Sequence, residues 1–152
     1  MREITRAKIV VRNAANSDIR RVLESQVAKA KEQTMDLAKK LKGDTEVQTC
    51  YNVWKFLKNR IKYKEDSVQF QDIRLPKRLI KDGIGDCKSF ALLTAGVLSN
   101  CGIESFFTYT SYNHVPVPSH VYVTTKNGVI IDGVWSSFNS EKKPVYKQHK
   151  RI

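Results

Sequence analysis

The sequence predicts a mixed domain in which helices come first and β-strands follow. Apolar residues recur every three or four positions between residues 17 and 61, which is typical of amphipathic helices. The stretch from Cys87 to about Asn100 is apolar on nearly all sides, which predicts a buried helix. After Gly102 the period changes to that of strands. With 152 residues, 41% of them hydrophobic and 28% charged, the chain is long enough to bury a core.

Two amphipathic helices are expected before the buried one. Residues 17–41 are predicted to form one long helix, and a second helix follows Asp44, which would cap it. A short strand is expected over residues 4–11. The apolar residues of the two helices are Ile19, Val22, Leu23, Val27, Ala30, Leu37, Ala38 and Leu41, then Val47, Cys50, Trp54, Leu57 and Ile61.

The basic residues divide the chain into three parts. Residues 1–43 form a basic N-terminal segment with the long helix, residues 44–137 form the core, and residues 138–152 form a basic C-terminal tail. The first segment holds eleven Lys and Arg against five Asp and Glu, and residues 141–152 hold five against one. The net charge of +12 is therefore concentrated at the two ends. We expect the polar tail to be partly disordered.

This charge favours acidic partners, such as nucleic acid or a capsid or assembly protein, bound through residues 1–43 and 141–152. A solvated surface explains the same charge, and no nucleic-acid-binding motif supports the first interpretation. The first residues lack the apolar stretch of a secretory signal, and no run of apolar residues is long enough to span a membrane. We therefore expect a cytoplasmic protein, or a virion-associated one if a bacteriophage encodes it.

The three cysteines lie in different surroundings. Cys50 falls within the apolar stripe of the second helix and Cys101 follows the end of the third, so both are expected to be structural. Cys87 begins the third helix, and Asp86 before it is a suitable N-cap. The partial positive charge of a helix N-terminus favours a thiolate, although an inert buried cysteine is the alternative. The spacing of cysteine and histidine fits no zinc site, so no metal is expected.

The loop before Cys87 contains Gly83 and Gly85. Because glycine has no side chain, we expect these two positions to leave room for a substrate backbone to approach the thiol.

A hairpin near the C-terminus offers a base and an orienting group for such a thiol. Two β-rich runs are joined by residues 126–128 (Lys-Asn-Gly); His120 begins the first run and Asp132 ends the second. With a two-residue turn, His120 would face Trp135 and Asp132 would point to the other face. With a three-residue loop or a bulge, Asp132 lies opposite Tyr122, diagonal to His120 and within reach of a hydrogen bond. A His–Asp pair therefore predicts the longer loop.

The histidines and the aspartate also have structural interpretations. His120 can be a structural histidine whose ring nitrogens are hydrogen-bonded within the fold. Asp132 precedes a glycine, and aspartate is common at such turns. His114 and His149 are expected at the surface.

The segment from about Tyr51 to Trp135 resembles the transglutaminase-like superfamily of cysteine enzymes, which is related in architecture to papain-like peptidases. The residues that carry the resemblance are Arg74-Leu75-Pro76, Leu79, Asp82-Gly83, Gly85-Asp86-Cys87, Phe90-Ala91-Leu92-Leu93, Gly102-Ile103, Ser119-His120-Val121-Tyr122-Val123 and Ile131-Asp132. The resemblance implies an α+β fold, in which the Cys-bearing helix packs against a small antiparallel sheet that carries the histidine and the aspartate.

The resemblance further implies Cys87 as nucleophile, His120 as base and Asp132 as the group that orients the base. Tyr122 stands where members often have tryptophan, and Val129 where an aromatic residue often precedes the aspartate, which leaves the substrate preference open. Compact relatives of this kind occur in microbial and bacteriophage proteins.

The expected function is acyl transfer from a peptide or glutamine-type amide through a thioester. Hydrolysis, by a peptidase or amidase, is favoured over transamidation because it needs only water. The Cys87 backbone N–H would hold the oxyanion with one further donor, for which Tyr63, Gln69 and Gln71 are candidates. No metal or organic cofactor is needed.

The alternative is a non-enzymatic binding or assembly module, for example a phage structural component. It would keep the same fold and dock acidic partners through the basic helix and tail.

Overall fold

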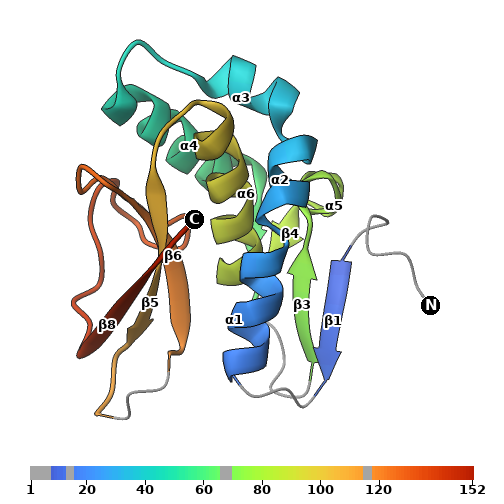
Figure 1. Ribbon diagram of the computed structural model, residues 1–152, viewed down its shortest axis with the longest axis vertical. Coiled ribbons are helices and arrows are strands. Elements are labelled where there is room, and N and C mark those ends of the chain that lie inside the picture. Colours follow the sequence, from blue (N-terminus) through green and yellow to red (C-terminus); the bar gives the residue numbers. More distant parts are fainter. Residues whose placement is uncertain (1–7, 13–15, 66–69, 115–117) are drawn as a thin grey trace.

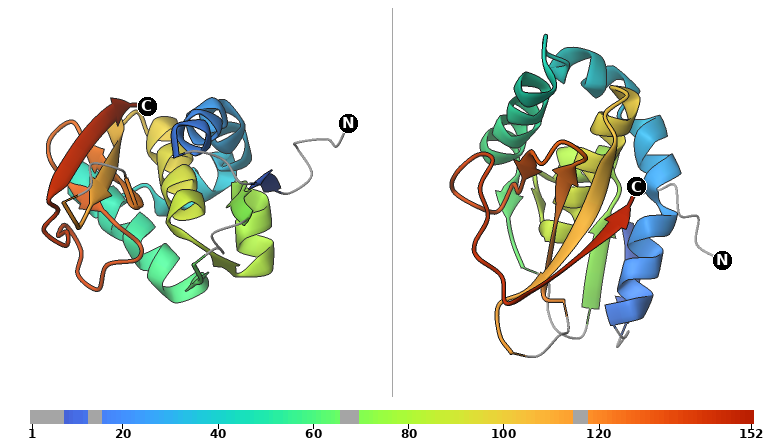
Figure 2. Two further views of the ribbon diagram at one scale, coloured as in Figure 1. Left: turned by 90° about the horizontal axis from the view of Figure 1, so that it is seen from below. Right: turned by 60° about the vertical axis from the view of Figure 1, so that its left-hand side comes forward.

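A buried helix, α6 (Cys87–Asn100), lies at the centre of the molecule. The computed structural model describes residues 8–12, 16–65, 70–114 and 118–152. Helix α6 lies between a four-stranded sheet on one side and α1 (Asn16–Ser25) and α2 (Val27–Gln33) on the other (Figures 1 and 2). Every residue from Ser89 to Leu98 is buried, as the continuous apolar pattern predicted. The predicted α+β fold class is confirmed.

The four-stranded sheet has the order β7-β6-β5-β8, and all its neighbouring strands are antiparallel. Its strands are β5 (Ser105–Ser111), β6 (His120–Thr125), β7 (Ile130–Ile131) and β8 (Tyr146–Arg151). Phe107, Val121 and Val123 share one buried cluster with the apolar side chains of α6. Each such fully buried side chain stabilises the fold by about 1.5–3 kcal/mol relative to an exposed one. This packing fixes the sheet against the helix that begins at Cys87.

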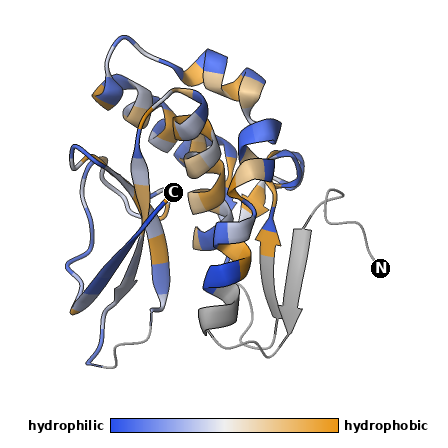
Figure 3. Cartoon of the chain, viewed as in Figure 1, coloured by the Kyte–Doolittle hydropathy of each residue, from blue (hydrophilic) through white to orange (hydrophobic). Residues whose placement is uncertain are grey.

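The C-terminal residues form a strand, which corrects the expectation of a partly disordered tail. Strand β8 pairs with β5 over its whole length, from Tyr146 opposite Ser111 to Arg151 opposite Phe106. All six of its residues are exposed, and Figure 3 shows that it is hydrophilic along most of its length. Because neither face is buried, the sequence lacks the apolar–polar alternation that identifies a strand.

The long helix predicted over residues 17–41 is interrupted at Gln26 and at Thr34, so it forms α1, α2 and α3 (Met35–Leu41). Thr34 Oγ1 donates to the carbonyl of Ala30 at 2.8 Å, and the Thr34 N–H donates to Lys31 O, only three residues back. Such bonding tightens and bends a helix. The apolar face is nevertheless the predicted one, because Ala30 and Ala38 are buried in the core.

The remaining elements frame the start of α6. They are β1 (Lys8–Arg12), α4 (Glu46–Arg60), β2 (Lys62–Tyr63), β3 (Phe70–Arg74), α5 (Pro76–Asp82) and β4 (Ile84–Gly85). Thr45, and not the predicted Asp44, caps α4. Strand β1 pairs antiparallel with β3; it overlaps the expected strand over residues 4–11, of which 4–7 lie outside the described residues.

Strand β2 pairs parallel with β4. This pairing places Tyr63 beside Gly85, two residues before Cys87. Within the described part of the chain, none of the helices has the length and hydrophobicity needed to cross a membrane.

Candidate active site

The hairpin between β6 and β7 has the register that a His–Asp pair requires. Val123 pairs with Ile131, which matches a three-residue loop over residues 126–128. Gly128 in that loop has φ 93°, a left-handed conformation that glycine adopts without strain. Continuing the register by one residue places Asp132 opposite Tyr122. The predicted three-residue loop is confirmed.

His120 and Asp132 meet across this hairpin. His120 Nε2 lies 2.7 Å from Asp132 Oδ2, and the two side chains are only 12% and 5% exposed. Asp132 is itself held in place: its Oδ1 accepts a hydrogen bond from the N–H of Val134 at 3.0 Å, and its carbonyl oxygen accepts one from Trp54 Nε1 at 3.1 Å. A fixed carboxylate therefore directs Nε2 of the imidazole.

Cys87 lies close enough to the imidazole to affect the pKa of His120. Burial lowers the pKa of His120, but hydrogen bonds with Asp132 and Cys87, and the negative charges of both groups, outweigh burial and raise the pKa from 6.5 to about 10. Since Nε2 faces Asp132, the other ring nitrogen, Nδ1, is available to the sulfur. His120 therefore keeps its proton at neutral pH, and a protonated imidazole stabilises negative charge on a neighbouring sulfur.

Asp86 and Cys87 form the N-terminus of α6, as predicted. Asp86 is 2% exposed; its Oδ1 accepts hydrogen bonds from the N–H groups of Lys88 at 3.1 Å and Ser89 at 3.4 Å, and its Oδ2 pairs with the Lys88 ammonium group. Cys87 is the first helical residue and is 9% exposed. The two N–H groups that Asp86 caps both follow Cys87 in the first turn of the helix.

The glycines before Cys87 have a different role from the one expected. A Cβ on Gly85 would lie 2.4 Å from Leu79 Cδ1, so this glycine permits close packing of α5 against the loop. Gly83, with φ 66°, ends α5 in the left-handed conformation. Packing accounts for Gly85 and capping for Gly83, and the expected room for a substrate stays a prediction.

The other two cysteines lie where the thiol form is favoured. Burial and the nearby charge of Glu46 raise the pKa of Cys50 to about 12. Cys101 is the C-cap of α6, and burial raises its pKa although the charge of Lys42 acts in the opposite direction. Both observations agree with the structural roles expected for Cys50 and Cys101. The residues that the structure describes contain no group of His, Cys, Asp and Glu side chains that could hold a metal ion.

Of the three candidate oxyanion donors, Tyr63 is the one whose side chain the structure places near the site. Tyr63 is 39% exposed; its partial burial raises its pKa, and the negative charges of Cys87, Glu65, Asp86 and Asp132 raise it further. Its hydroxyl therefore keeps its proton and shares the electrostatic surroundings of the thiol. Gln69 lies outside the described residues, and Gln71 is described only through its backbone in β3.

The sequence reasoning missed Tyr112, whose ring lies 6.1 Å from that of His120. Thr110 on β5 pairs with His120 on β6, so Tyr112, two residues beyond Thr110, follows the same face of the sheet. The β5–β6 register was the signal that would have identified it, but no turn sequence in the connecting segment defines that register. His114 and His149 are exposed, as expected.

Comparison with known proteins agrees with this geometry. Residues 32–135 match the sequence pattern of a transglutaminase-like domain family. No curated protein matches the chain. A solved structure described as a "putative cysteine protease" from Cytophaga hutchinsonii has a similar fold, with a TM-score of 0.52 and 21% identity. The match covers 68% of this chain but 37% of that protein, and at this identity it supports the fold alone.

Proposed function

Since this chain belongs to the transglutaminase-like family, we propose that it is a cysteine enzyme that transfers acyl groups from a peptide or glutamine-type amide through a thioester. The strongest support is His120, which bonds to Asp132 through Nε2 and lies near enough to Cys87 for that group to raise its pKa. In this proposal Cys87 is the nucleophile, His120 acts as general base and acid, and Asp132 orients the imidazole.

In the first half-reaction, the sulfur of Cys87 attacks the carbonyl carbon of the amide. A C–S bond forms, and the π electrons of the carbonyl move to its oxygen. We assign the N–H of Cys87 and the O–H of Tyr63 as donors to this oxyanion. The C–N bond then breaks as His120 gives its proton to the leaving amine, and a thioester on Cys87 remains.

In the second half-reaction, water attacks the thioester while His120 accepts one of its protons. The C–S bond breaks, the carboxylic acid leaves, and the Cys87 thiolate and the protonated imidazole are restored. The net reaction converts an amide and water to an acid and an amine. A primary amine in place of water would give a transamidase, and we favour water because it needs no binding site of its own.

N,N-dimethylcasein is a suitable probe because it offers many peptide bonds and glutamine amides. The protein is incubated with it, with and without dansylcadaverine, and the products are identified by mass spectrometry. New peptide ends indicate proteolysis, glutamate in place of glutamine indicates an amidase, and dansyl adducts indicate transamidation.

We expect Cys87→Ala to abolish these products and Cys101→Ser to retain them. Equal product formation by Cys87→Ala and the unaltered protein would contradict the proposal.

A further inference from the structure

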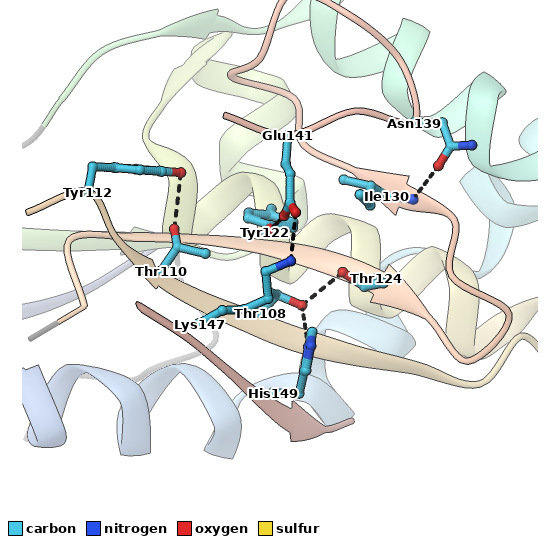
Figure 4. Close-up of polar contacts among 10 residues, drawn as sticks. All are labelled: Thr108, Thr110, Tyr112, Tyr122, Thr124, Ile130, Asn139, Glu141, Lys147 and His149. Carbon is cyan, nitrogen blue, oxygen red and sulfur yellow. Dashed lines mark hydrogen bonds and ion pairs between the residues drawn. The ribbon is translucent and has the colours of Figure 1, made fainter. Parts of the chain in front are cut away.

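The chain between β7 and β8 passes over the sheet face that carries His120. Residues 138–145, which we call the strap, are attached at both ends. Asn139 Oδ1 accepts a hydrogen bond from the N–H of Ile130 at 2.9 Å, and the N–H of Val145 donates to Ser111 O at 2.8 Å. Figure 4 shows the strap contacts on this face of the sheet. The strap lies outside residues 32–135, which match the family.

Tyr122 connects the strap to His120. Strand alternation places the two residues on one face of β6, and their ring centroids are 5.8 Å apart. Tyr122 is 1% exposed, and its O–H donates to Glu141 Oε2. Lys147 Nζ in turn donates to Glu141 Oε1 at 2.6 Å, so β8 holds the carboxylate in place (Figure 4).

A second strap residue, Lys142, contacts Tyr112. The Tyr112 ring lies beside the imidazole of His120, as the Tyr122 ring does. Lys142 Nζ lies 4.5 Å from the centroid of the Tyr112 ring, a cation–π contact. Thr110 Oγ1 donates to the Tyr112 hydroxyl at 3.0 Å. In the β5–β6 register, Tyr122 and Tyr112 lie on opposite sides of His120. Consecutive strap residues therefore hold the two rings that flank the imidazole.

The bond to Asp132 alone does not fix the imidazole. A single hydrogen bond at Nε2 sets the distance to the carboxylate but allows the ring to turn about the line that joins the two atoms. Rings on both sides restrict this turn and so limit the directions in which Nδ1 can point. Misplacement of a reacting group by about 1 Å can reduce a rate on the order of 100-fold, so such restriction matters for catalysis.

We propose that Glu141 is a positioning residue for His120, which acts by holding the Tyr122 ring against the imidazole. The proposal rests on the proposed catalytic role of His120. It assigns to the strap, outside the family-matched segment, a part in the alignment of the active site.

The test is the rate at which iodoacetamide alkylates Cys87, measured as a function of pH in Glu141→Ala, Tyr122→Phe and Glu141→Gln. We expect Glu141→Ala and Tyr122→Phe to slow alkylation at neutral pH by about tenfold and to shift its half-maximal rate to higher pH. Glu141→Gln keeps an oxygen that accepts from Tyr122, so it should remain near the rate of the unaltered protein. Tyr122→Phe, the smallest change, serves if Glu141→Ala does not fold.

Glu104 provides a matched control. It pairs with Lys126 and Arg151 at the far end of β5 from His120. Glu104→Ala removes a comparable ion pair from the same sheet, and we expect the alkylation rate and its pH profile to stay unchanged.

The outcomes separate this inference from the proposed function. If Cys87 in the unaltered protein reacts no faster than Cys101, the proposed function is wrong, and so is the positioning role that rests on it. If Cys87 reacts fast but Glu141→Ala and Tyr122→Phe leave its rate and pH profile unchanged, the positioning role alone is wrong. If Glu141→Gln slows the reaction as much as Glu141→Ala, the charge of Glu141 acts instead of its bond to Tyr122, which also contradicts the proposal.

Discussion

The two ends of α6 each carry a cysteine, and the two thiols have opposite surroundings. Cys87 at the N-terminal end lies near His120 and raises its pKa, whereas Cys101 at the C-terminal end lies 3.8 Å from the carbonyl oxygen of Ala38. The helix dipole is positive at the first end and negative at the second. Cys101 is nevertheless the more exposed of the two. The groups beside each thiol and the end of the helix on which it lies therefore distinguish the candidate nucleophile from the structural thiol. Exposure to solvent does not.

Removal of the carboxylate behind His120 should have the largest effect. In Asp132→Asn the amide cannot support the protonated imidazole, and we expect kcat for dimethylcasein turnover to fall on the order of 10⁴-fold, as when a triad carboxylate becomes an amide. Asp36→Asn, an exposed change on α3, is the control and should keep full turnover. Unchanged turnover in Asp132→Asn would exclude the orienting role.

The same variant should alter the dependence of stability on pH. The pKa of His120 is raised on folding, from 6.5 to about 10, so its contribution to stability is fully present below pH 6.5 and is lost as the pH rises through about 10. Urea unfolding across this range should show that loss in the unaltered protein. The loss should be smaller in Asp132→Asn, because the carboxylate that raises the pKa is absent.

A smaller loss of turnover is expected when Tyr63, the oxyanion donor that we assign near the N-terminal end of α6, is altered. Tyr63→Phe removes one hydroxyl and should lower kcat on the order of 100-fold with little change in KM, because the bond forms mainly in the transition state. Tyr51→Phe, on the exposed side of α4, is the matched control. If both variants turn over casein equally, another group supplies the second donor.

The smallest effects are expected when the polar side chain that anchors one or the other end of α6 is removed. Asp86 caps its N-terminus, and Asn100 Nδ2 donates to Lys31 O at 2.7 Å and to Thr34 Oγ1 at 3.0 Å at the other end. Asp86→Ala and Asn100→Ala should each lower the free energy of unfolding by about 1 kcal/mol.

Hydrogen exchange should locate the two losses. We expect faster exchange at the N–H groups of Lys88 and Ser89 in Asp86→Ala, with reduced turnover. Asn100→Ala should leave both unchanged. The same exchange pattern in both variants would mean that the two ends of α6 are not independent.

Features set by neighbouring residues could be predicted from the sequence. Asp86 followed by an apolar helix predicted the cap and placed Cys87 at its first residue. The sequence of residues 126–128 allowed a two-residue or a three-residue turn, and the structure has the three-residue loop that a His120–Asp132 pair requires. Both signals are local, since a cap and a short loop depend on a few consecutive residues.

Features set by distant contacts could not be predicted. The interruption at Thr34 depends on a side-chain bond to Ala30 that competes with regular helix bonding. Strand β8 is polar on both faces, so only its pairing with β5 makes it a strand. The approach of Glu141 to Tyr122 likewise requires the strap to return over the sheet, which no local pattern encodes.

Competition among the three thiols for iodoacetamide in the folded protein tests the proposed nucleophile most directly. Peptide mapping by mass spectrometry gives one rate for each cysteine at neutral pH. We predict that Cys87 reacts at least about tenfold faster than the more exposed Cys101. Cys50 should be slowest, and His120→Gln should remove the advantage of Cys87. Equal rates for the three, or a fastest reaction at Cys101, would contradict the assignment of Cys87 as the nucleophile.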